Sequence, residues 1–364
     1  MKKLVLAGGG HGHINILKQL IKNPVKDCEI TLITDYKRQY YSGMLPGFIE
    51  GIYTEDEISF NVEDLCKKAG VRYIKEKIIE IDGNRKVVKT EDLNGSKENR
   101  EYEFDFISMN LGSYAINKYK IGENATYVKP ISSIVEFMKK IDKSKEKSPD
   151  KKKKLVIIGG GASGIELSFA FRERYKDMDI EVISKRDILY RFNEKTRNKA
   201  KKEMERKNIH LHLNESLTEV LENEIITSRG KYFYDYLVIS NGVSGTKVKY
   251  SGYDVTDENF LIVDSNLCAN KYSIAMGDMI CIREYPSTPK AGVFAIRQAP
   301  ILYGNLMNML KGIDARTSYT PQDKYLQVLN CGNKSAIMNY SDYSFKGRIS
   351  WIIKDHIDRG YMKV

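Results

Sequence analysis

The sequence predicts an α/β protein built from two similar units and a small α+β C-terminal region, and two observations lead to this class. Glycine-rich turns near residues 8 and 159 each follow an aliphatic run and precede an amphipathic segment, which is the order strand, tight turn, helix. Short alternating strands follow each turn, so the chain shows an internal duplication with a period of about 150 residues. We therefore expect two Rossmann-like domains, each with a parallel sheet and an antiparallel β-meander.

Composition and charge narrow the class further. With 364 residues, 41% hydrophobic and 29% charged, the chain can form two or three domains with full cores. No apolar run approaches the roughly 20 residues that span a bilayer. The five cysteines are scattered, which fits free thiols in a reducing, cytoplasmic compartment. The net charge of +11 is compatible with anionic partners, but no nucleic-acid-binding motif accompanies it, and no nucleic-acid partner is predicted.

The first unit begins with a βαβ segment. Residues 3–7 form an aliphatic run typical of a buried strand, and an apolar stripe from Ile14 to Ile21 marks an amphipathic helix. Residues 29–34 form the second strand. Alternating residues between 71 and 113 then predict the antiparallel meander.

Two stretches are expected to lack regular structure. Residues 40–53, YYSGMLPGFIEGIY, combine several glycines with aromatic side chains, so we expect a loop that either lies over a flat ligand or packs on the surface. Residues 142–154, DKSKEKSPDKKKK, are charged and of low complexity. We expect them to connect the two units outside any core.

The second unit repeats the order of the first, and a distinct tail follows it. The apolar periodicity predicts, in chain order, a strand at 155–158, a helix to Arg174, a strand at 180–184, a helix at 195–207, strands within 208–228 and 231–242, strands at 257–264 and 273–278, a long helix at 289–310, strands at 324–332 and 334–340, and a final helix at 347–362.

The second glycine turn has the complete G-x-G-x-x-G spacing. Gly159 makes the turn, Gly161 lets a pyrophosphate approach the backbone, and Gly164 lets the helix and strand pack closely. The N-terminus of the following helix offers unpaired N–H groups and a positive dipole end to the phosphates. Two such turns in one chain suggest two dinucleotides and electron transfer between them.

The order of motifs resembles a known superfamily over nearly the whole chain. G-x-G, FDFISMNLGS, the second glycine turn, YDYLVISNGVSG and SIAMGD occur as in the two-dinucleotide-binding flavoproteins of the pyridine nucleotide-disulfide oxidoreductase superfamily. Within it, the chain looks most similar to the type II NADH dehydrogenase and sulfide:quinone oxidoreductase branch. The strings YSGMLPG, KAGVFAIRQAP and KDHIDRGYM resemble more specifically the flavoprotein module found fused to selenide, water dikinase.

This resemblance implies a domain plan and an activity. Residues 1–120 and 250–315 would form a discontinuous FAD domain, residues 121–249 an inserted NAD(P)H domain, and residues 316–364 a region that covers the flavin or mediates dimer or membrane contact. The activity implied is hydride transfer from NAD(P)H to FAD and then to a quinone or another small acceptor. One alternative is a reductase of a selenium or sulfur compound linked to selenium metabolism. Another is a flavin- and nucleotide-binding sensor with little turnover.

The first turn and its surroundings would bind FAD, with two departures from the family pattern. His13 stands at the third glycine position, where it would loosen the helix contact or point at a ligand, and Thr34 replaces the usual ribose-binding acid, with Asp35 one place later. Lys290 would either stabilise charge on the reduced flavin or face solvent. The residues that the resemblance assigns to this site are Gly8, Gly10, His11, Gly12, Thr34, Asp35, Ser42, Gly43, Met44, Leu45, Pro46, Ile78, Asn110, Gly112, Ser113, Gly277, Asp278, Lys290, Ala291, Gly292 and Val293.

The second turn would bind the nicotinamide cofactor, with Glu166 and Lys290 as the candidate catalytic residues. Glu166 matches a position near the nicotinamide in relatives. The next strand ends in a hydroxyl and two cations, the arrangement expected to accept a 2′-phosphate, which slightly favours NADPH. The residues assigned to this site are Gly159, Gly161, Ala162, Ser163, Gly164, Ser184, Lys185, Arg186, Asn241 and Gly242.

Missing features also constrain the function. The first helix lacks the redox cysteine pair of the disulfide reductases, and Cys281 is the one candidate for redox work beside the flavin. The glutamine pattern of quinone reductases is kept only in part, at Ala295, Arg297 and Gln298. The histidines lack the partners of a zinc site, so no metal is predicted. The final helix, with an apolar face from Ile349 to Tyr361, either packs on the body or a second subunit or lies on a membrane.

Overall fold

The computed structural model describes residues 1–93, 99–147 and 152–363, and its largest sheet combines parallel strands with a meander. Its order is β21-β22-β8-β1-β2-β5-β6-β7, and β19 pairs with β5 off this path. β1 lies at the centre, parallel to β2 and β8 on its two sides. The strands are β1 (Lys2–Ala7), β2 (Cys28–Thr34), β5 (Arg72–Asp82), β6 (Val87–Asp92), β7 (Asn99–Glu103), β8 (Phe106–Met109), β19 (Lys249–Ser251), β21 (Cys268–Asn270) and β22 (Ser273–Ala275).

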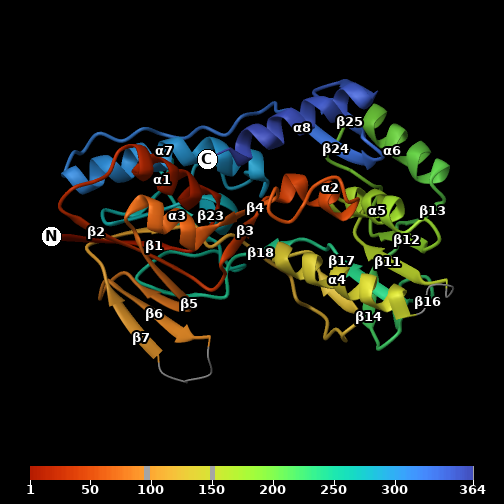
Figure 1. Ribbon diagram of the computed structural model, residues 1–364, viewed down its shortest axis with the longest axis horizontal. Coiled ribbons are helices and arrows are strands. Elements are labelled where there is room, and N and C mark those ends of the chain that lie inside the picture. The colour runs from red at the N-terminus through yellow and green to blue at the C-terminus, as the bar shows by residue number, and fades with distance from the viewer. Residues whose placement is uncertain (94–98, 148–151, 364) are drawn as a thin grey trace.

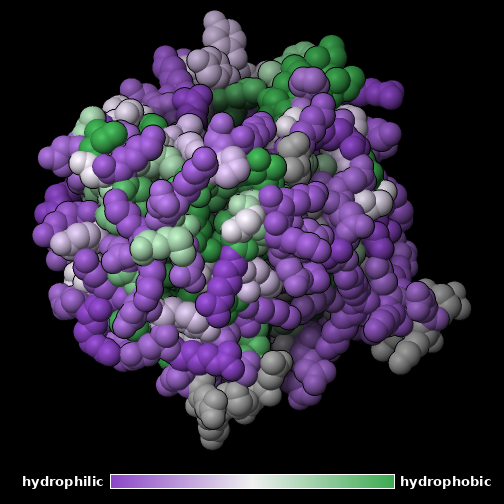
Figure 2. All heavy atoms as spheres, turned by 60° about the vertical axis from the view of Figure 1, so that its left-hand side comes forward, coloured by the Kyte–Doolittle hydropathy of each residue, from purple (hydrophilic) through white to green (hydrophobic). Residues whose placement is uncertain are grey.

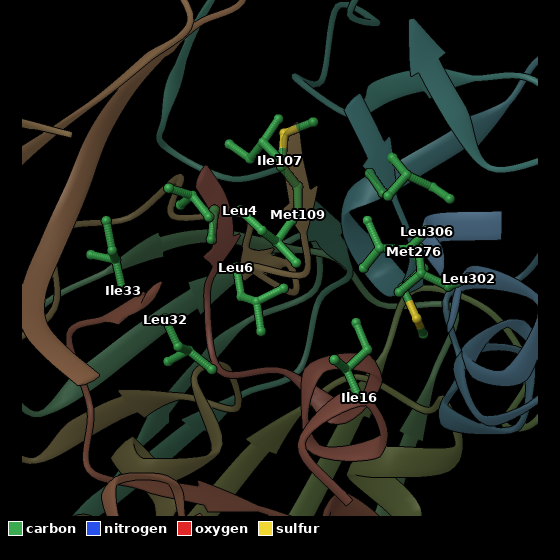
Figure 3. Packing of buried hydrophobic residues seen from close by; sticks show 14 of the residues in the cluster. Leu4, Leu6, Ile16, Leu32, Ile33, Ile107, Met109, Met276, Leu302 and Leu306 are labelled. Atoms are coloured by element: carbon green, nitrogen blue, oxygen red, sulfur yellow. The ribbon is translucent and has the colours of Figure 1, made fainter. Parts of the chain in front are cut away.

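Helices α1 (His11–Lys22) and α7 (Gly292–Lys311) pack against each other and close the first core. Figure 3 shows Leu6 of β1, Ile16 of α1, and Met276 and Leu302 gathered in this core. All four side chains are fully buried. α1 is amphipathic, so its apolar stripe faces the sheet and holds the N-terminus of the helix at the carboxyl end of β1.

The second sheet repeats the first at smaller size. Its parallel strands run in the order β10-β17-β11-β12-β13, and a separate antiparallel meander, β14-β15-β16, lies beside it. Both units therefore contain a βαβ segment followed by antiparallel strands, and the predicted fold class is confirmed. The elements are β10 (Ala125–Tyr127), α4 (Ile131–Lys147), β11 (Lys154–Ile158), α5 (Ala162–Arg174), β12 (Asp179–Ser184), α6 (Glu194–Arg206), β13 (Ile209–Leu213), β14 (Leu217–Val220), β15 (Glu224–Thr227), β16 (Lys231–Phe233) and β17 (Tyr236–Ile239).

The C-terminal region crosses the top of the molecule in Figure 1, where α8 runs from the second unit back toward the first. It consists of β24 (Gln327–Gly332), β25 (Ser335–Tyr340), β26 (Tyr343–Gly347) and α8 (Arg348–Met362). The third strand, β26, was not predicted. The shorter elements are β3 (Arg38–Tyr40), β4 (Ser59–Asn61), α3 (Val62–Ala69), β9 (Tyr114–Ala115), β18 (Val243–Ser244), β20 (Leu261–Val263), η2 (Gly277–Met279) and β23 (Ile280–Ile282).

The loop predicted at 40–53 is wrong. The segment forms a 3₁₀ turn, η1 (Ser42–Met44), and a short helix, α2 (Leu45–Ile49). Pro46 lies in the first turn of α2, where a missing N–H does no harm, and Gly51 leaves the segment with a φ of 82°. The five residues of α2 are all buried, and α2 contacts α5. Tertiary burial, which a local pattern cannot show, stabilises this short helix.

The connection predicted at 142–154 is wrong in its first part. Helix α4 continues to Lys147, because an apolar stripe ending at Ile141 is buried and the charged residues beyond it are good helix formers. The Asp142 carboxylate pairs with Arg174 at 2.6 Å. Residues 148–151 lie outside the described part of the chain, and Lys154 already belongs to β11.

Candidate functional site

The first glycine turn leaves β1 and opens onto the N-terminus of α1. Gly8 has a φ of 92°, and a Cβ placed there would lie 2.6 Å from the carbonyl oxygen of Asn110. Gly10 is the N-cap of α1, and a glycine has no side chain with which to satisfy the first N–H groups of the helix. The Gly12 N–H of this turn is satisfied by Asn110, so the other N–H groups of the first turn are those left for the pyrophosphate that the sequence predicts.

Asn110 links the first glycine turn to the segment before Gly277 and Asp278, which we call the GD motif. Its Oδ1 accepts a hydrogen bond from the Gly12 N–H at 2.8 Å, and its Nδ2 donates to the Met276 carbonyl at 3.0 Å. Its backbone carbonyl accepts from the Gly10 N–H at 3.2 Å. One buried amide thus joins the end of β8, the start of α1 and the segment before η2, so three predicted FAD-binding segments lie together.

His13 is buried inside the fold and does not point at a ligand. Its Nδ1 is 2.5 Å from the carbonyl oxygen of Gly8, and its Nε2 is 2.9 Å from Ser108 Oγ. Burial lowers the pKa of His13 to about 4, so the ring is neutral. The expectation that His13 loosens the helix contact is wrong, because its two hydrogen bonds hold the turn to β8.

Two predicted ribose-binding residues end β2. Thr34 is 2% exposed, and its Oγ1 is buried without a hydrogen-bond partner among the residues that the structure describes. Burial raises the pKa of the neighbouring Asp35 carboxyl. An unpaired buried hydroxyl is uncommon in a complete protein and fits a bound hydroxyl or phosphate group. Ile78 lies further away along the chain in β5 and is buried in the first core.

The GD motif is tied to residues that the sequence analysis did not connect with it. The Gly277 N–H donates to Gln298 Oε1 at 2.8 Å, so Gln298 holds this turn. The Asp278 carboxylate forms an ion pair with Lys129 at 2.5 Å, and Lys129 also donates to Ser113 Oγ at 2.7 Å. Lys129 follows β10 of the second sheet, so this ion pair bridges the two units. A single lysine before a proline gave no signal of this role.

Lys290 is partly buried beside the start of α7. Its ammonium donates a hydrogen bond to the Ile280 carbonyl and lies 4.6 Å from the centre of the Phe260 ring. Burial lowers its pKa. It is therefore not a solvent-facing lysine, and it contacts β23 from the rim of a small cavity that Gly277 also lines. Ala291 caps α7, and Gly292 and Val293 form its first turn.

The second glycine turn has the close backbone contacts that its G-x-G-x-x-G spacing predicts. A Cβ on Gly159 would lie 2.1 Å from the Ser240 carbonyl oxygen, and one on Gly164 would lie 2.0 Å from the Gly159 carbonyl oxygen. Gly161 caps α5, whose first turn contains Ala162 and Ser163. At the end of β17, Asn241 Oδ1 is a second buried oxygen with no partner in residues 1–93, 99–147 and 152–363, and Gly242 follows it with a φ of 104°.

The three residues expected to contact the 2′-phosphate of the nucleotide differ in their exposure. Ser184 is buried, and its side chain packs behind Gly160, where an added Cβ would lie 2.4 Å from Ser184 Oγ. Lys185 and Arg186 are exposed. The Arg186 guanidinium lies 5.2 Å from the centre of the Tyr190 ring, and Arg191 lies over the same ring at 5.5 Å. The turn after β12 therefore presents three cations to solvent.

Glu166 lies in α5 under the C-terminal region. Its Oε1 accepts a hydrogen bond from the backbone N–H of Asn330 at 2.8 Å. Burial raises the pKa of Glu166 to about 7, although Lys354 of α8 opposes this shift. Glu166 can therefore hold or release a proton near neutral pH.

The inner face of α8 is polar, which the sequence analysis missed. Asp358 accepts hydrogen bonds from Tyr41 at 3.1 Å and from Lys354 at 2.5 Å, and Lys354 also donates to the Gly43 carbonyl. Ser350 and Asp358 are its buried residues. The polar spacing of residues 350, 354 and 358, one turn apart each time, was the available signal.

Tyr361 joins this polar face to the first glycine turn. Its hydroxyl is 2.8 Å from His11 Nδ1, and its ring lies 4.7 Å from that of Tyr41. Burial lowers the pKa of His11 to about 4. In the segment before α2, Ser42 is exposed and Gly43 is partly exposed, whereas Met44, Leu45 and Pro46 are buried. The predicted loop residues therefore lie between α8 and the first turn.

The part of the chain that the structure describes contains neither a metal site nor a membrane-spanning helix. Within it, no three His, Cys, Asp or Glu side chains gather as a metal site would require, and no helix is long and apolar enough to cross a membrane. All five cysteines are free, and Cys281 lies partly buried in β23.

Comparison with known proteins identifies the family. The family model for pyridine nucleotide-disulphide oxidoreductases matches residues 2–299. The chain is 24% identical over 365 residues to NADH dehydrogenase-like protein YutJ of Bacillus subtilis, covering 97% of each chain. It is 25% identical over 256 residues to NAD(P)H coenzyme A polysulfide/persulfide reductase of Pyrococcus horikoshii, and this match covers 66% of the chain and 54% of that longer relative.

Solved structures share the fold at lower identity. Sulfide:quinone oxidoreductase from Aquifex aeolicus superposes with a TM-score of 0.77 and 18% identity, covering 99% of this chain and 90% of the other. NDH2 from Plasmodium falciparum in complex with NADH superposes with a TM-score of 0.76 and 16% identity, covering 99% and 96%. Because the family model matches most of its length, this chain belongs to the pyridine nucleotide-disulphide oxidoreductases and is a flavin-dependent NAD(P)H oxidoreductase.

Proposed function

We propose that the protein is an FAD-dependent NAD(P)H:acceptor oxidoreductase, with FAD at the first glycine turn and the nicotinamide cofactor at the second. One observation carries this assignment: each turn leads into a helix whose N-cap is a glycine, and each has beside it a buried oxygen, Thr34 Oγ1 or Asn241 Oδ1, that lacks a partner within the described residues. The domain plan proposed from the sequence, with residues 121–249 inserted between two parts of the FAD domain, follows from the same assignment.

The residues of the site would bind, orient and supply protons. Bound FAD would accept a hydride from NAD(P)H and pass two electrons on, which is the chemistry of the cofactor and not of a side chain. The turn from Gly8 to Gly12 would lie against its pyrophosphate, because its glycines have no side chains to block the approach, and Asp278 would face its ribityl chain. Reduction of a two-electron acceptor by NAD(P)H consumes one proton, and Glu166 is placed to hold that proton near pH 7.

The acceptor that we propose is a quinone. Full-length similarity to an NADH dehydrogenase-like protein and structural similarity to NDH2 support this class. A sulfur compound is the second candidate, supported by the polysulfide/persulfide reductase of P. horikoshii and the sulfide:quinone oxidoreductase of A. aeolicus. The selenium compound expected from the fused-module resemblance stays a prediction, as does the low-turnover sensor.

The cofactor that we propose is NADPH, by a narrow margin over NADH. Lys185, Arg186 and Arg191 present cations beside the second turn, where a 2′-phosphate would lie. Ser184 is turned inward, so the cations and not the hydroxyl support this preference.

A surface contact through α8 belongs to the same proposal. Ile349, Ile352 and Ile357 are 61%, 53% and 50% exposed, and with Tyr343 and Phe345 of β26 they form an apolar surface that we call the isoleucine face. Figure 2 shows hydrophobic residues gathered at the upper edge of the molecule, the edge that α8 occupies in Figure 1. Packing of these isoleucines onto the body, one expectation from the sequence, is wrong. The isoleucine face supports peripheral contact with a membrane or pairing with a second copy.

Anaerobic stopped-flow spectroscopy tests the assignment. The FAD-loaded protein is mixed with NADPH or NADH, and the flavin absorbance is followed. We expect at least one nucleotide to bleach the flavin within seconds, and subsequent mixing with a quinone or a persulfide to restore the absorbance. If neither nucleotide bleaches it, the proposed activity is wrong.

A further inference from the structure

A second partly buried carboxyl, that of Glu50, lies on the other side of Asn330 from Glu166 and belongs to none of the predicted sites. Glu50 caps the C-terminal end of α2, and its carboxylate contacts the turn between β24 and β25. Its Oε1 accepts from Asn330 Nδ2 at 2.6 Å, and its Oε2 accepts from the Asn333 N–H at 3.0 Å. Asn330 is 3% exposed and Asn333 is exposed, so the carboxylate extends from the interior to the surface.

Asn330 connects Glu50 to Glu166 by two different groups. Its side-chain amide donates to Glu50, whereas its backbone N–H donates to Glu166. β24 is an edge strand, and the backbone N–H of Asn330 is not used by the sheet. The pairing of β24 with β25 shifts register after Asn330. The backbone of a bulged edge strand can take several positions, and the hydrogen bond from the Asn330 side-chain amide to Glu50 fixes one of them.

We propose that Glu50 is a positioning residue: through the side chain of Asn330 it holds the backbone N–H of Asn330 against the Glu166 carboxylate. This inference rests on the proposed function for the role of Glu166 in holding a proton. The hydrogen bond between the Asn330 N–H and Glu166 does not depend on turnover. A hydrogen bond of 2.6 Å from a buried amide is a strong restraint, because the amide would otherwise be left without an acceptor.

The restraint has a direct consequence for proton affinity. A backbone N–H that donates to a carboxylate favours the charged form, so loosening it makes Glu166 a weaker acid. The charged or titratable groups that face Glu166 are Lys354, Asp358, Tyr41 and Cys331, and those that face Glu50 are Glu173 and Lys207. Burial raises the pKa of Glu50 to about 7 as well, so both carboxyls titrate in the same pH range.

The variants separate two properties of Glu50: the hydrogen bond that it accepts from Asn330 and its negative charge. Glu50→Gln removes the charge but keeps an oxygen that accepts from Asn330, whereas Glu50→Ala removes both. Asn330→Ala breaks the same link from the other side while keeping the backbone N–H, so it also serves if Glu50→Ala fails to fold. Glu219→Ala, an exposed residue of β14, is the control.

The experiment is a pH titration of protonated carboxyl bands by difference infrared spectroscopy on the FAD-loaded protein without nucleotide. The Glu166 band is assigned by its loss in Glu166→Gln. We expect Glu50→Ala and Asn330→Ala to raise the Glu166 pKa by about one unit, and Glu50→Gln and Glu219→Ala to leave it unchanged. The proposal is overturned if Glu50→Ala and Asn330→Ala leave the titration unchanged, or if Glu50→Gln shifts it as far as Glu50→Ala does.

The same variants also keep this inference separate from the proposed function. If NAD(P)H fails to bleach the flavin while Glu50→Ala still shifts the Glu166 titration, the oxidoreductase assignment fails and the positioning role stands. If the flavin is bleached normally and the titration does not move in either Glu50→Ala or Asn330→Ala, the positioning role fails alone.

Discussion

Burial shifts the pKa values of individual residues in and around the candidate site. Glu166 and Glu50 have pKa values raised to about 7, while His11 and His13 have theirs lowered to about 4, and in each case burial is the largest cause. Glu166 and Lys290 could be chosen from the sequence through a family resemblance. Their states could not, because the groups that surround them come from distant parts of the chain.

Glu166→Gln should stabilise the protein more at high pH than at low pH. The folded state holds the Glu166 proton more tightly than the unfolded chain does, so wild-type stability falls as pH rises from about 4.5 to about 7. The glutamine removes a penalty of up to about 3 kcal/mol that is complete only above pH 7. Thermal unfolding of both proteins at pH 5 and pH 8 measures this. An equal difference at the two pH values would contradict the raised pKa.

His13→Ala should destabilise the fold by about 2–4 kcal/mol, because it removes two buried hydrogen bonds and leaves a cavity beside β8. Urea unfolding at pH 7 measures the loss. His210→Ala removes an exposed imidazole from β13 and should change stability by less than about 0.5 kcal/mol. Similar values for the two variants would show that His13 does not hold the turn.

Lys185→Ala combined with Arg186→Ala should weaken NADPH binding about tenfold or more and leave NADH binding nearly unchanged. Each lost charge-assisted contact to a phosphate is worth about 1.5–3 kcal/mol. The ratio of dissociation constants, measured by fluorescence titration, is the readout, and Lys195→Ala in α6 is the exposed-lysine control. Equal weakening for both nucleotides would remove the basis for an NADPH preference.

Among the elements, α8 departs furthest from its sequence pattern. An amphipathic helix normally buries its apolar stripe, yet α8 buries Ser350 and Asp358 and exposes three isoleucines. The apolar periodicity predicted the helix correctly and left its orientation open, and the structure excludes the orientation in which these three isoleucines pack on the body. Polar partners supplied by Tyr41, Gly43 and His11 make the polar side the inner one.

Ile349→Ser combined with Ile352→Ser should reduce adsorption to vesicles that contain anionic lipid, because the isoleucine face loses apolar area without loss of internal packing. Co-sedimentation measures adsorption, and light scattering on the same samples measures self-association. Leu221→Ser, an exposed leucine away from α8, is the control. If the double variant changes neither quantity, the isoleucine face is not a contact surface.

The α2 segment is a second case in which the local sequence pattern predicted the wrong structure. Glycines and aromatic residues predicted a loop, but five consecutive buried residues and a proline in the first turn make a helix. Its stability comes from α5, which lies more than 100 residues away in sequence. The helix in turn places Glu50 at the β24–β25 turn, so a wrong local prediction concealed a residue of the site.

The two similar units are joined by a hydrophobic cluster in which α2 packs on α5, and by polar contacts that include the Lys129–Asp278 ion pair at the GD motif. Both side chains are partly buried, at 26% and 20% exposed. Such a pair can align the second unit on the GD motif while the C-terminal region covers both from above (Figure 1).

A double-mutant cycle of Lys129→Met and Asp278→Asn should give a coupling energy of about 1–3 kcal/mol in thermal or urea unfolding, since each single variant leaves a partly buried polar group with one partner fewer. The exposed pair Lys3–Glu103, at 50% and 75% exposed, should give a smaller coupling in the same cycle, because solvent screens it. Coupling at Lys129 no larger than at Lys3 would mean that the ion pair does not join the units.

The sequence by itself determined the fold class, the two glycine turns and the family, because strand and helix periods and glycine spacing are local properties of the chain. Only the tertiary structure decided which face of α8 is buried, that residues 40–49 contain a helix, and that Glu50, Lys129, Asn330 and Asp358 belong around the site. Contacts between residues hundreds of positions apart, and the burial that they create, have no local signature.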